Sequence, residues 1–415
     1  MQQRNLADSI LAALKDTPVV FLAGARQVGK STLCQWLAEN GHTARYLTLD
    51  DAAVLAAARA DPGGFLASLA GPVILDEAQR VLDLSLAIKA AVDRSRKPGR
   101  FLLTGSANVL LLPRLAEALA GRMEVLILWP FSQGELRGTK ESFADAVFAD
   151  PWNIEGRFDE ARGALLKKVA VGGYPPACER KDPERRKAWF GSYLTTILQR
   201  DIRDLANVEG LVALPRLLAL VASRAGGLLN HADLSRGAGI PQTTLKRYMA
   251  LLETTFLVRT VPAWSSNLGL RLTKSPKLFL CDTGLLAYLL GWQPEETRGA
   301  GNMMGAALEN FVVMELTKQI TWSKGRPGLF HFRTQTGQEV DIVLENARGE
   351  IVGIEVKASS LVDSKDFKGL RVLAAATGER FRRGVVLYTG NEVLPFGPNL
   401  YAAPAAALWS RPKGV

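Results

Sequence analysis

The chain has 415 residues, of which 47% are hydrophobic and 22% charged, an ordinary globular composition that excludes a fibrous or low-complexity protein. At this length two or three domains are expected, because a single hydrophobic core stops growing earlier. The formal net charge of +10 and the sequence pI of about 9.5 favour nucleic acid or another polyanion as a partner.

The cysteines and the N-terminus bear on the cellular compartment. Cys34, Cys178 and Cys281 are far apart and form no CxxC or Cys/His spacing, which predicts neither a disulfide framework nor a zinc site. The N-terminus has helical periodicity and lacks the uninterrupted apolar stretch of a signal peptide. No window of about 18 apolar residues is without a charge, so we expect a cytoplasmic protein with no membrane span.

Five short apolar runs alternate with helical patterns in the N-terminal third. Near-continuous hydrophobicity is typical of strands that are covered on both faces, and the alternation with helices predicts a parallel sheet. The runs are residues 18–24, 44–51, 72–79, 100–107 and 123–131.

The segment FLAGARQVGKST follows the first run and opens a predicted helix. Its Gly24, Gly29, Lys30 and Ser31 fit the pattern GxxxxGK[ST] in the strand-to-helix context that this motif requires. The glycines let backbone N–H groups surround a phosphate at a helix N-terminus. We expect Lys30 to reach the outer phosphates of ATP and Ser31 to bind Mg²⁺, with Thr32 beside them in the nucleotide site.

Two acids end the third run, VILDEAQ. Asp76 would hold the Mg²⁺ ion, and Glu77 would polarise an attacking water. A strand can also end in two acids for solubility alone. The complete phosphate loop upstream favours the interpretation as a hydrolysis site.

The fourth run ends in a polar stretch, and an extra strand lies between the phosphate loop and the two acids. This order resembles the AAA+ branch of P-loop ATPases, in which such a strand carries a sensor of the γ-phosphate. Ser106 or Asn108 would be that sensor, although helix capping also explains a polar stretch. Arg122, just before the fifth run, would contact a phosphate in its own or a neighbouring subunit, or would be a solvated side chain.

Residues 140–225 predict helices with few strand signals. Arg200 lies on one amphipathic helix of this region, where it would be either a second phosphate-sensing arginine or part of a charged face.

The next segment has the layout of two helices around a tight turn. Helices at 231–237 and 242–252, joined by a Gly/Ile/Pro turn, resemble a helix-turn-helix, and two candidate strands, 256–261 and 277–283, extend it to a winged helix. Winged helices contact DNA or dock proteins. The polar residues of the second helix suit phosphates or base edges: Gln242, Thr243, Lys246 and Arg247.

The C-terminal third contains acids and a lysine on alternating apolar segments. QEVDIVLE and IVGIEVKAS are joined by NARG, which predicts a hairpin with Glu355 and Lys357 on one face and Asp341 beside them. With Glu309 on an upstream helix, they resemble PD-(D/E)XK nucleases, in which carboxylates, here Asp341 and Glu355, hold Mg²⁺ and the lysine orients the attacking water. Two alternatives remain, a hairpin whose polar face is merely charged and a nuclease fold kept as a non-catalytic platform.

Motifs along nearly the full length resemble a widespread prokaryotic family of AAA+ ATPases fused to a C-terminal domain of unknown function. They are GARQVGKSTL, VILDEAQ, LTGSAN, LAGR, GGYP, LQRDI, CDTGLLAYLLG, LEN, EVD and IEVKA. The resemblance implies an α/β fold with a parallel AAA+ sheet and a restriction-endonuclease-like end. The predicted parts are an AAA+ ATPase domain (1–136), a helical linker (137–225), a winged-helix domain (226–295) and a nuclease-like domain (296–415).

We therefore expect an ATPase that uses ATP and Mg²⁺, binds DNA, and remodels it or moves along it as a homo-oligomer, a hexamer being one candidate. The alternative is a nucleotide-gated switch or scaffold that binds a protein partner, with a non-catalytic nuclease-like domain. Arg26, in the phosphate loop, receives no role.

Overall fold

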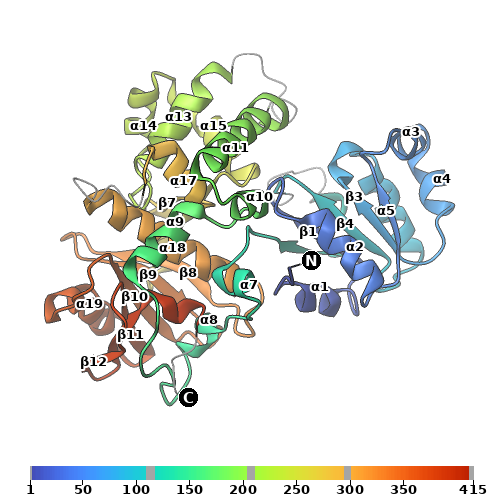
Figure 1. The fold of residues 1–415 in the computed structure, drawn as a ribbon. Coiled ribbons are helices and arrows are strands. Elements are labelled where there is room, and N and C mark those ends of the chain that lie inside the picture. The colour runs from blue at the N-terminus through green and yellow to red at the C-terminus, as the bar shows by residue number, and fades with distance from the viewer. Residues whose placement is uncertain (1, 109–116, 203–210, 294–300, 411–415) are drawn as a thin grey trace. The chain divides into compact units, whose positions relative to one another are not determined.

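The computed structural model describes residues 2–108, 117–202, 211–293 and 301–410 (Figure 1). The chain divides into two compact units. The first comprises residues 3–131 and 250–257, and the second comprises residues 132–249 and 258–415. The predicted boundaries of the four smaller parts stay predictions.

The first unit is built on a sheet of parallel strands in the order β2-β3-β4-β1-β5. The strands are β1 (Val19–Ala23), β2 (Arg45–Thr48), β3 (Val73–Asp76), β4 (Phe101–Gly105) and β5 (Met123–Ile127). The parallel sheet predicted from the five apolar runs is thus confirmed. β1, β3 and β4 are buried throughout, but β2 and β5 are largely half-exposed, so the expected cover on both faces is wrong for them. Both are edge strands, with a neighbour on one side only.

Helices connect these strands, as the alternating pattern predicts. They are α2 (Lys30–Glu39), α3 (Ala52–Ala60), α4 (Pro62–Ala67), the 3₁₀ turn η1 (Ala78–Arg80) and α5 (Leu84–Arg94), while α1 (Ala7–Ala13) precedes β1. Since α2 begins at Lys30, the phosphate loop spans the passage from a buried strand to a helix N-terminus.

The second unit begins with the predicted helical region, in which no strand lies among the described residues from 137 to 225. Its helices are α7 (Gln133–Arg137), α8 (Phe143–Ala146), α9 (Arg162–Val171), α10 (Pro175–Glu179), α11 (Pro183–Thr196) and α13 (Leu214–Ala222), with the π turn η3 (Ile197–Asp201) and the 3₁₀ turn η4 (Leu211–Ala213).

The predicted pair of helices follows as α14 (His231–Ala238) and α15 (Gln242–Thr254). Gly239 ends α14 with a φ of 70°, the left-handed conformation that glycine adopts without strain. β6 (Val258–Val261) and β7 (Lys277–Leu280) then pair antiparallel. Two more helices belong to this region, α16 (Leu268–Thr273) and α17 (Thr283–Leu290).

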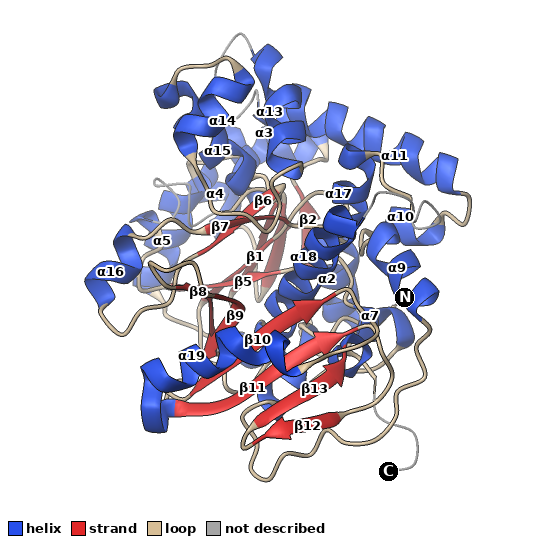
Figure 2. Cartoon of the chain, turned by 90° about the vertical axis from the view of Figure 1, so that its left-hand side faces the viewer, coloured by secondary structure: helices blue, strands red, loops and turns tan. Residues whose placement is uncertain are grey.

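The C-terminal part is a mixed sheet in the order β12-β13-β11-β10-β9-β8. Its strands are β8 (Gly328–Arg333), β9 (Glu339–Glu345), β10 (Ile351–Lys357), β11 (Phe381–Tyr388), β12 (Leu394–Gly397) and β13 (Leu400–Pro404), accompanied by α18 (Gly301–Ile320), α19 (Lys368–Thr377) and the 3₁₀ turns η5 (Ser364–Phe367), η6 (Gly378–Arg380) and η7 (Ala405–Leu408). Figure 2 shows α19 lying across this sheet, and Leu370 and Leu373 of α19 join its core. Among the described residues, none of the helices combines the length and the apolar character needed to cross a lipid bilayer.

Candidate functional site

Both glycines of the phosphate loop are needed for its geometry. A Cβ atom on Gly24 would lie 2.3 Å from the carbonyl oxygen of Leu128, so a larger residue has no room there. Gly29 caps α2 with a φ of 94°, in the left-handed region that other residues enter at a cost. The loop therefore ends with the N–H groups of α2 open to an anion. Ser31 is half-buried on the first turn of α2, and Thr32 is exposed beside it.

Lys30 is held inside the loop that it belongs to. Its ammonium group donates to the carbonyl oxygens of Gly24 and Ala25, each at 3.0 Å, and the residue is 4% exposed. Burial lowers the pKa of Lys30, while the carboxylates of Glu77 and Asp76 oppose that effect. The cation thus lies where the sequence pattern predicts, at the loop and near both acids.

Arg4 braces the loop, and no sequence motif indicates it. Its guanidinium group donates to the carbonyl oxygen of Val28 at 2.7 Å and to that of Trp129 at 2.6 Å, and it lies 4.6 Å from the centre of the Phe131 ring. Arg4 is buried, so these bonds are shielded from competing water. The brace joins the phosphate loop to the segment that follows β5.

Asp76 ends β3 and is oriented by two hydroxyl groups. Thr104, on β4, donates to one carboxylate oxygen, and the hydroxyl of Tyr46, on β2, donates to the other at 2.7 Å. Burial and then the hydrogen bond to Asp76 raise the pKa of Tyr46, so it stays a neutral donor. Sequence reasoning missed both residues, which come from the strands beside β3.

Glu77, Gln79 and Ser106 form a connected set. The amide of Gln79 donates to the Glu77 carboxylate and, at 3.1 Å, to the Ser106 hydroxyl. Glu77 has a φ of 58°, a strained value for a residue with a side chain, and its N–H donates to Thr104 at 3.0 Å. The structure therefore brings Ser106 and Glu77 together. The N–H of the other sensor candidate, Asn108, donates to the carbonyl oxygen of Thr254 at 2.8 Å.

Arg122 lies at the N-terminal ends of the strands, whereas the phosphate loop lies at their C-terminal ends. It precedes β5, whose first residue, Met123, is level with Val19, the start of β1, whereas the loop follows the far end of β1. Five strand residues span about 17 Å. Arg122 instead makes two hydrogen bonds to Asp93, of 2.6 and 2.9 Å. The structure thus does not bring Arg122 to the phosphate loop of its own chain.

The predicted C-terminal hairpin is confirmed, and it brings acids together. β9 and β10 pair antiparallel with Ile342 opposite Ile354, and Asp341 accepts a hydrogen bond of 3.0 Å from the N–H of Val356. Asp341 and Glu355 are both buried, and Glu309 lies on α18 as predicted. Burial, and next the Asp341 carboxylate, raise the pKa of both Glu309 and Glu355.

A lysine from outside the motif lies among these acids. The ammonium group of Lys277, on β7, is 2.8 Å from Glu309 and 3.1 Å from Asp341, and the Lys277 side chain is 4% exposed. Burial alone would lower the pKa of Lys277, but the two carboxylates outweigh it and raise the pKa. Lys357 is further out, 3.7 Å from Glu355 and 36% exposed. Among the described residues, no three His, Cys, Asp or Glu side chains are grouped to hold a metal ion.

The second helix of the predicted helix-turn-helix presents its polar residues to solvent. Gln242, Thr243, Lys246 and Arg247 are exposed, while Leu245 and its apolar neighbours are buried. This amphipathic division follows the helical period of the sequence. Arg200 is also exposed, on η3 of the second unit.

Three family models match separate parts of the chain. An AAA domain matches residues 16–137, a domain of unknown function (DUF8612) matches residues 162–296, and a second domain of unknown function (DUF4143) matches residues 304–408. The expected P-loop AAA domain at the N-terminus is thereby confirmed. The two other families are of unknown function and indicate no activity.

Two similar relatives cover nearly the whole chain. These uncharacterized proteins, Rv2008c of Mycobacterium tuberculosis and Mb2031c of Mycobacterium bovis, are each 32% identical over 406 residues, which is 98% of this chain and 84% of theirs. An uncharacterized protein of Haemophilus influenzae is 25% identical over 52% of this chain and 51% of its own. The Thermotoga maritima RuvB Holliday junction branch migration motor covers 62% of this chain and 89% of that chain at 19% identity, but its TM-score of 0.30 is too low to support an argument.

Proposed function

Because the chain belongs to the same family as the two mycobacterial proteins and contains an AAA domain, we propose that it is a Mg²⁺-dependent ATPase that acts on DNA. In this proposal ATP binds the phosphate loop, and its hydrolysis remodels DNA or moves the protein along it. The protein acts as a homo-oligomer.

The link from Glu77 through Gln79 to Ser106 carries the hydrolysis part of the proposal. Glu77 would orient the attacking water as a base, and Ser106 would sense the γ-phosphate. Gln79 also has a buried carbonyl oxygen with no partner among the described residues. A water at the reaction centre would supply the missing donor.

Ser31 and Asp76 fit a magnesium site. A hydroxyl and a carboxylate are oxygen ligands of the kind that Mg²⁺ prefers. The donors that hold Asp76, Thr104 and Tyr46, are neutral hydroxyls, which leave the charge of the carboxylate for a cation. When bound, the ion would neutralise charge on the outer phosphates. Lys30 would exchange its two carbonyl partners for phosphate oxygens.

The exposed face of α15 supports DNA as the substrate. Gln242, Thr243 and Lys246 combine hydrogen-bonding groups with positive charge at the start of a second helix, the part that enters the major groove in helix-turn-helix proteins. The formal net charge of +10 favours the same partner.

ATP turnover measured with and without DNA tests this function. We expect duplex, single-stranded or branched DNA to raise turnover, and Lys246→Glu to weaken that stimulation without changing basal turnover, while the matched control Lys324→Glu leaves both intact. Turnover that none of the three DNA forms changes would remove DNA from the proposal. Lys30→Ala should abolish ATP binding, and retained affinity would overturn the ATPase itself.

The position of Lys277 favours a second candidate, a nucleotide-gated switch or scaffold whose nuclease-like domain does not cleave. An ammonium group among the acids supplies the positive charge that a metal ion would otherwise bring. Plasmid cleavage in Mg²⁺ or Mn²⁺ separates the two readings. The switch predicts no cleavage by either the wild type or Lys357→Ala, whereas cleavage lost on that substitution would establish a nuclease.

A further inference from the structure

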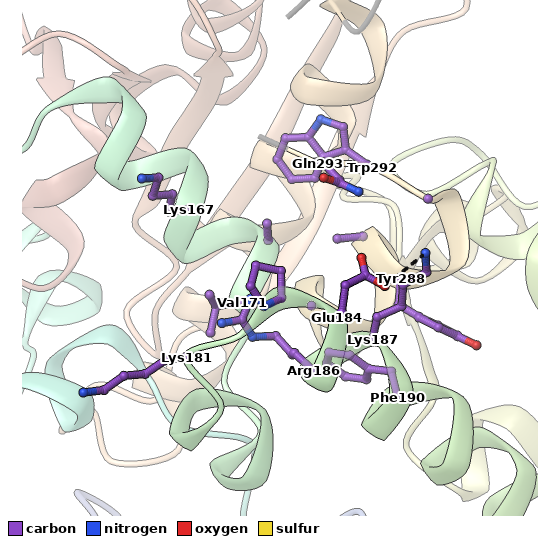
Figure 3. A pocket seen from close by; sticks show the side chains of 15 residues that line it. Lys167, Val171, Lys181, Glu184, Arg186, Lys187, Phe190, Tyr288, Trp292 and Gln293 are labelled. Carbon is purple, nitrogen blue, oxygen red and sulfur yellow. Dashed lines mark ion pairs between the residues drawn. The ribbon is translucent and has the colours of Figure 1, made fainter. Parts of the chain in front are cut away.

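The second unit contains a cavity of about 310 Å³ between α9, α11 and α17. Figure 3 shows it with Lys167 and Lys181 on the left, Glu184 and Lys187 on the right, and Trp292 above. None of its lining residues belongs to the phosphate loop or to the group of Glu309, Asp341, Glu355 and Lys277. The volume is at the lower end of the range for small-molecule sites.

The apolar residues that line the cavity are closely packed. Phe190 and Trp292 are 1% and 7% exposed, and the Phe190 ring stacks on that of Tyr288 with 6.0 Å between the centroids. Gly284, on α17, lets the helices approach, since a Cβ there would lie 2.3 Å from the carbonyl oxygen of Val171. These contacts determine the shape of the apolar lining in the absence of a ligand.

The rim of the cavity is basic. Lys167, Lys181, Arg186 and Lys187 supply four cations, and Glu184 is the single acid, 4.0 Å from Lys187. The lining residues thus carry four positive charges and one negative charge, a net charge of +3. Such a concentration of charge attracts anions from a distance.

Arg186 is oriented toward this role by its neighbours. Its Nε donates to the carbonyl oxygen of Ala177 at 3.2 Å, and one terminal nitrogen donates to that of Arg180 at 2.7 Å. A guanidinium group has five N–H donors. Within the described part of the chain these are its only hydrogen bonds, so the remaining N–H groups can meet an anion from a fixed position.

We propose that this cavity binds a nucleoside 5′-phosphate, either as a free nucleotide or as the phosphorylated end of a nucleic acid strand. A planar nucleobase fits the aromatic, apolar lining of a cavity of this size, and the phosphate group fits the basic side chains. The site is separate from the phosphate loop and does not depend on ATP hydrolysis.

Calorimetric titration with AMP tests the proposal. All variants in this titration also carry Lys30→Ala, so that the phosphate loop does not contribute to AMP binding. The result can therefore be interpreted even if the ATPase proposal is wrong. We expect AMP to bind at least about tenfold more tightly than adenosine or inorganic phosphate. Lys167→Glu/Lys181→Glu should weaken AMP binding about tenfold or more, whereas the control Lys324→Glu/Lys365→Glu, with the same change of charge at exposed positions, should not.

A 5′-phosphorylated trinucleotide distinguishes the two sources of the ligand. Tighter binding of the trinucleotide than of AMP indicates a strand end, and weaker binding indicates a free nucleotide. No binding of AMP at about 5 mM, or equal affinity in the two double variants, would overturn the proposal.

Discussion

Lys277 and Glu309 form a buried ion pair of 2.8 Å that joins β7 to α18. The same ammonium group reaches Asp341 on β9, so one cation links three elements that are far apart in the sequence. A pair shielded from water is sensitive to the loss of one partner, because the remaining charge stays buried without compensation.

Replacing Lys277 with methionine should therefore lower the free energy of unfolding by about 3 to 5 kcal/mol. Urea denaturation measures the effect. The double variant Lys277→Met/Glu309→Gln should recover part of the loss, because it removes one of the uncompensated charges. Lys357→Met serves as the control and should cost less than about 1 kcal/mol, since Lys357 is 36% exposed and its nearest carboxylate among the described residues, that of Glu355, is 3.7 Å away. Equal losses in the two single variants would contradict a special role for Lys277.

Arg4→Met should weaken ATP binding about tenfold. The substitution leaves the carbonyl oxygens of Val28 and Trp129 without their donor, and the phosphate loop loses its attachment. Titration with a fluorescent ATP analogue measures the affinity, and circular dichroism checks that the protein stays folded. Arg59→Met, at an exposed position on α3, is the matched control. Unchanged affinity in a folded Arg4→Met protein would show that the brace is dispensable.

Gln79→Ala should lower ATP turnover about tenfold while leaving ATP affinity intact. The Gln79 amide donates to Glu77 and Ser106, the two residues proposed to act in hydrolysis, so its loss should disturb hydrolysis rather than binding. Glu77→Gln should be more severe, about 10²-fold or more, because the base itself is lost. Steady-state turnover and analogue titration separate the two effects. If Gln79→Ala changed affinity alone, Gln79 would be a binding residue.

Stability should depend on the ionisation of Glu141. Burial, and next the Glu315 carboxylate, raise the pKa of Glu141 from 4.5 to about 7. Because the folded protein holds this proton more tightly than the unfolded chain, the stabilisation is complete below pH 4.5 and is lost as the pH rises through 7.

Glu141→Gln removes this titration and can still accept the hydrogen bond from the N–H of Gly134. The variant should match the wild type at about pH 4.5 and exceed its free energy of unfolding at pH 8 by at most about 3 kcal/mol. Melting temperatures measured across that range test the difference. Parallel profiles for the two proteins would mean that Glu141 has the same pKa in the folded and the unfolded protein.

The sequence predicted the parts of the site that lie within one short motif. Lys30 begins the helix that follows β1, and Asp76 is the last residue of β3, so the apolar runs and the GxxxxGK[ST] spacing were enough to predict where both lie. The hairpin of β9 and β10 was predictable for the same reason, since its period of two and its short turn are local.

The residues that were missed come from other parts of the chain. Arg4, Tyr46 and Lys277 reach their sites only through the tertiary fold, and none carries a local signal. Arg122 shows a different limit. Arg122 precedes β5, which runs parallel to β1 with Met123 level with Val19, so Arg122 lies at the opposite ends of these strands from the phosphate loop.

The bond from Arg4 to Val28 also bears on how a minimal ATP-binding fragment should be cut. A fragment that starts at residue 16 keeps every motif residue but discards the arginine that anchors the loop from outside the sheet. Such a fragment would underestimate the affinity of the intact protein. Recombinant versions intended for nucleotide studies should therefore retain the first five residues and carry any purification tag at the other terminus.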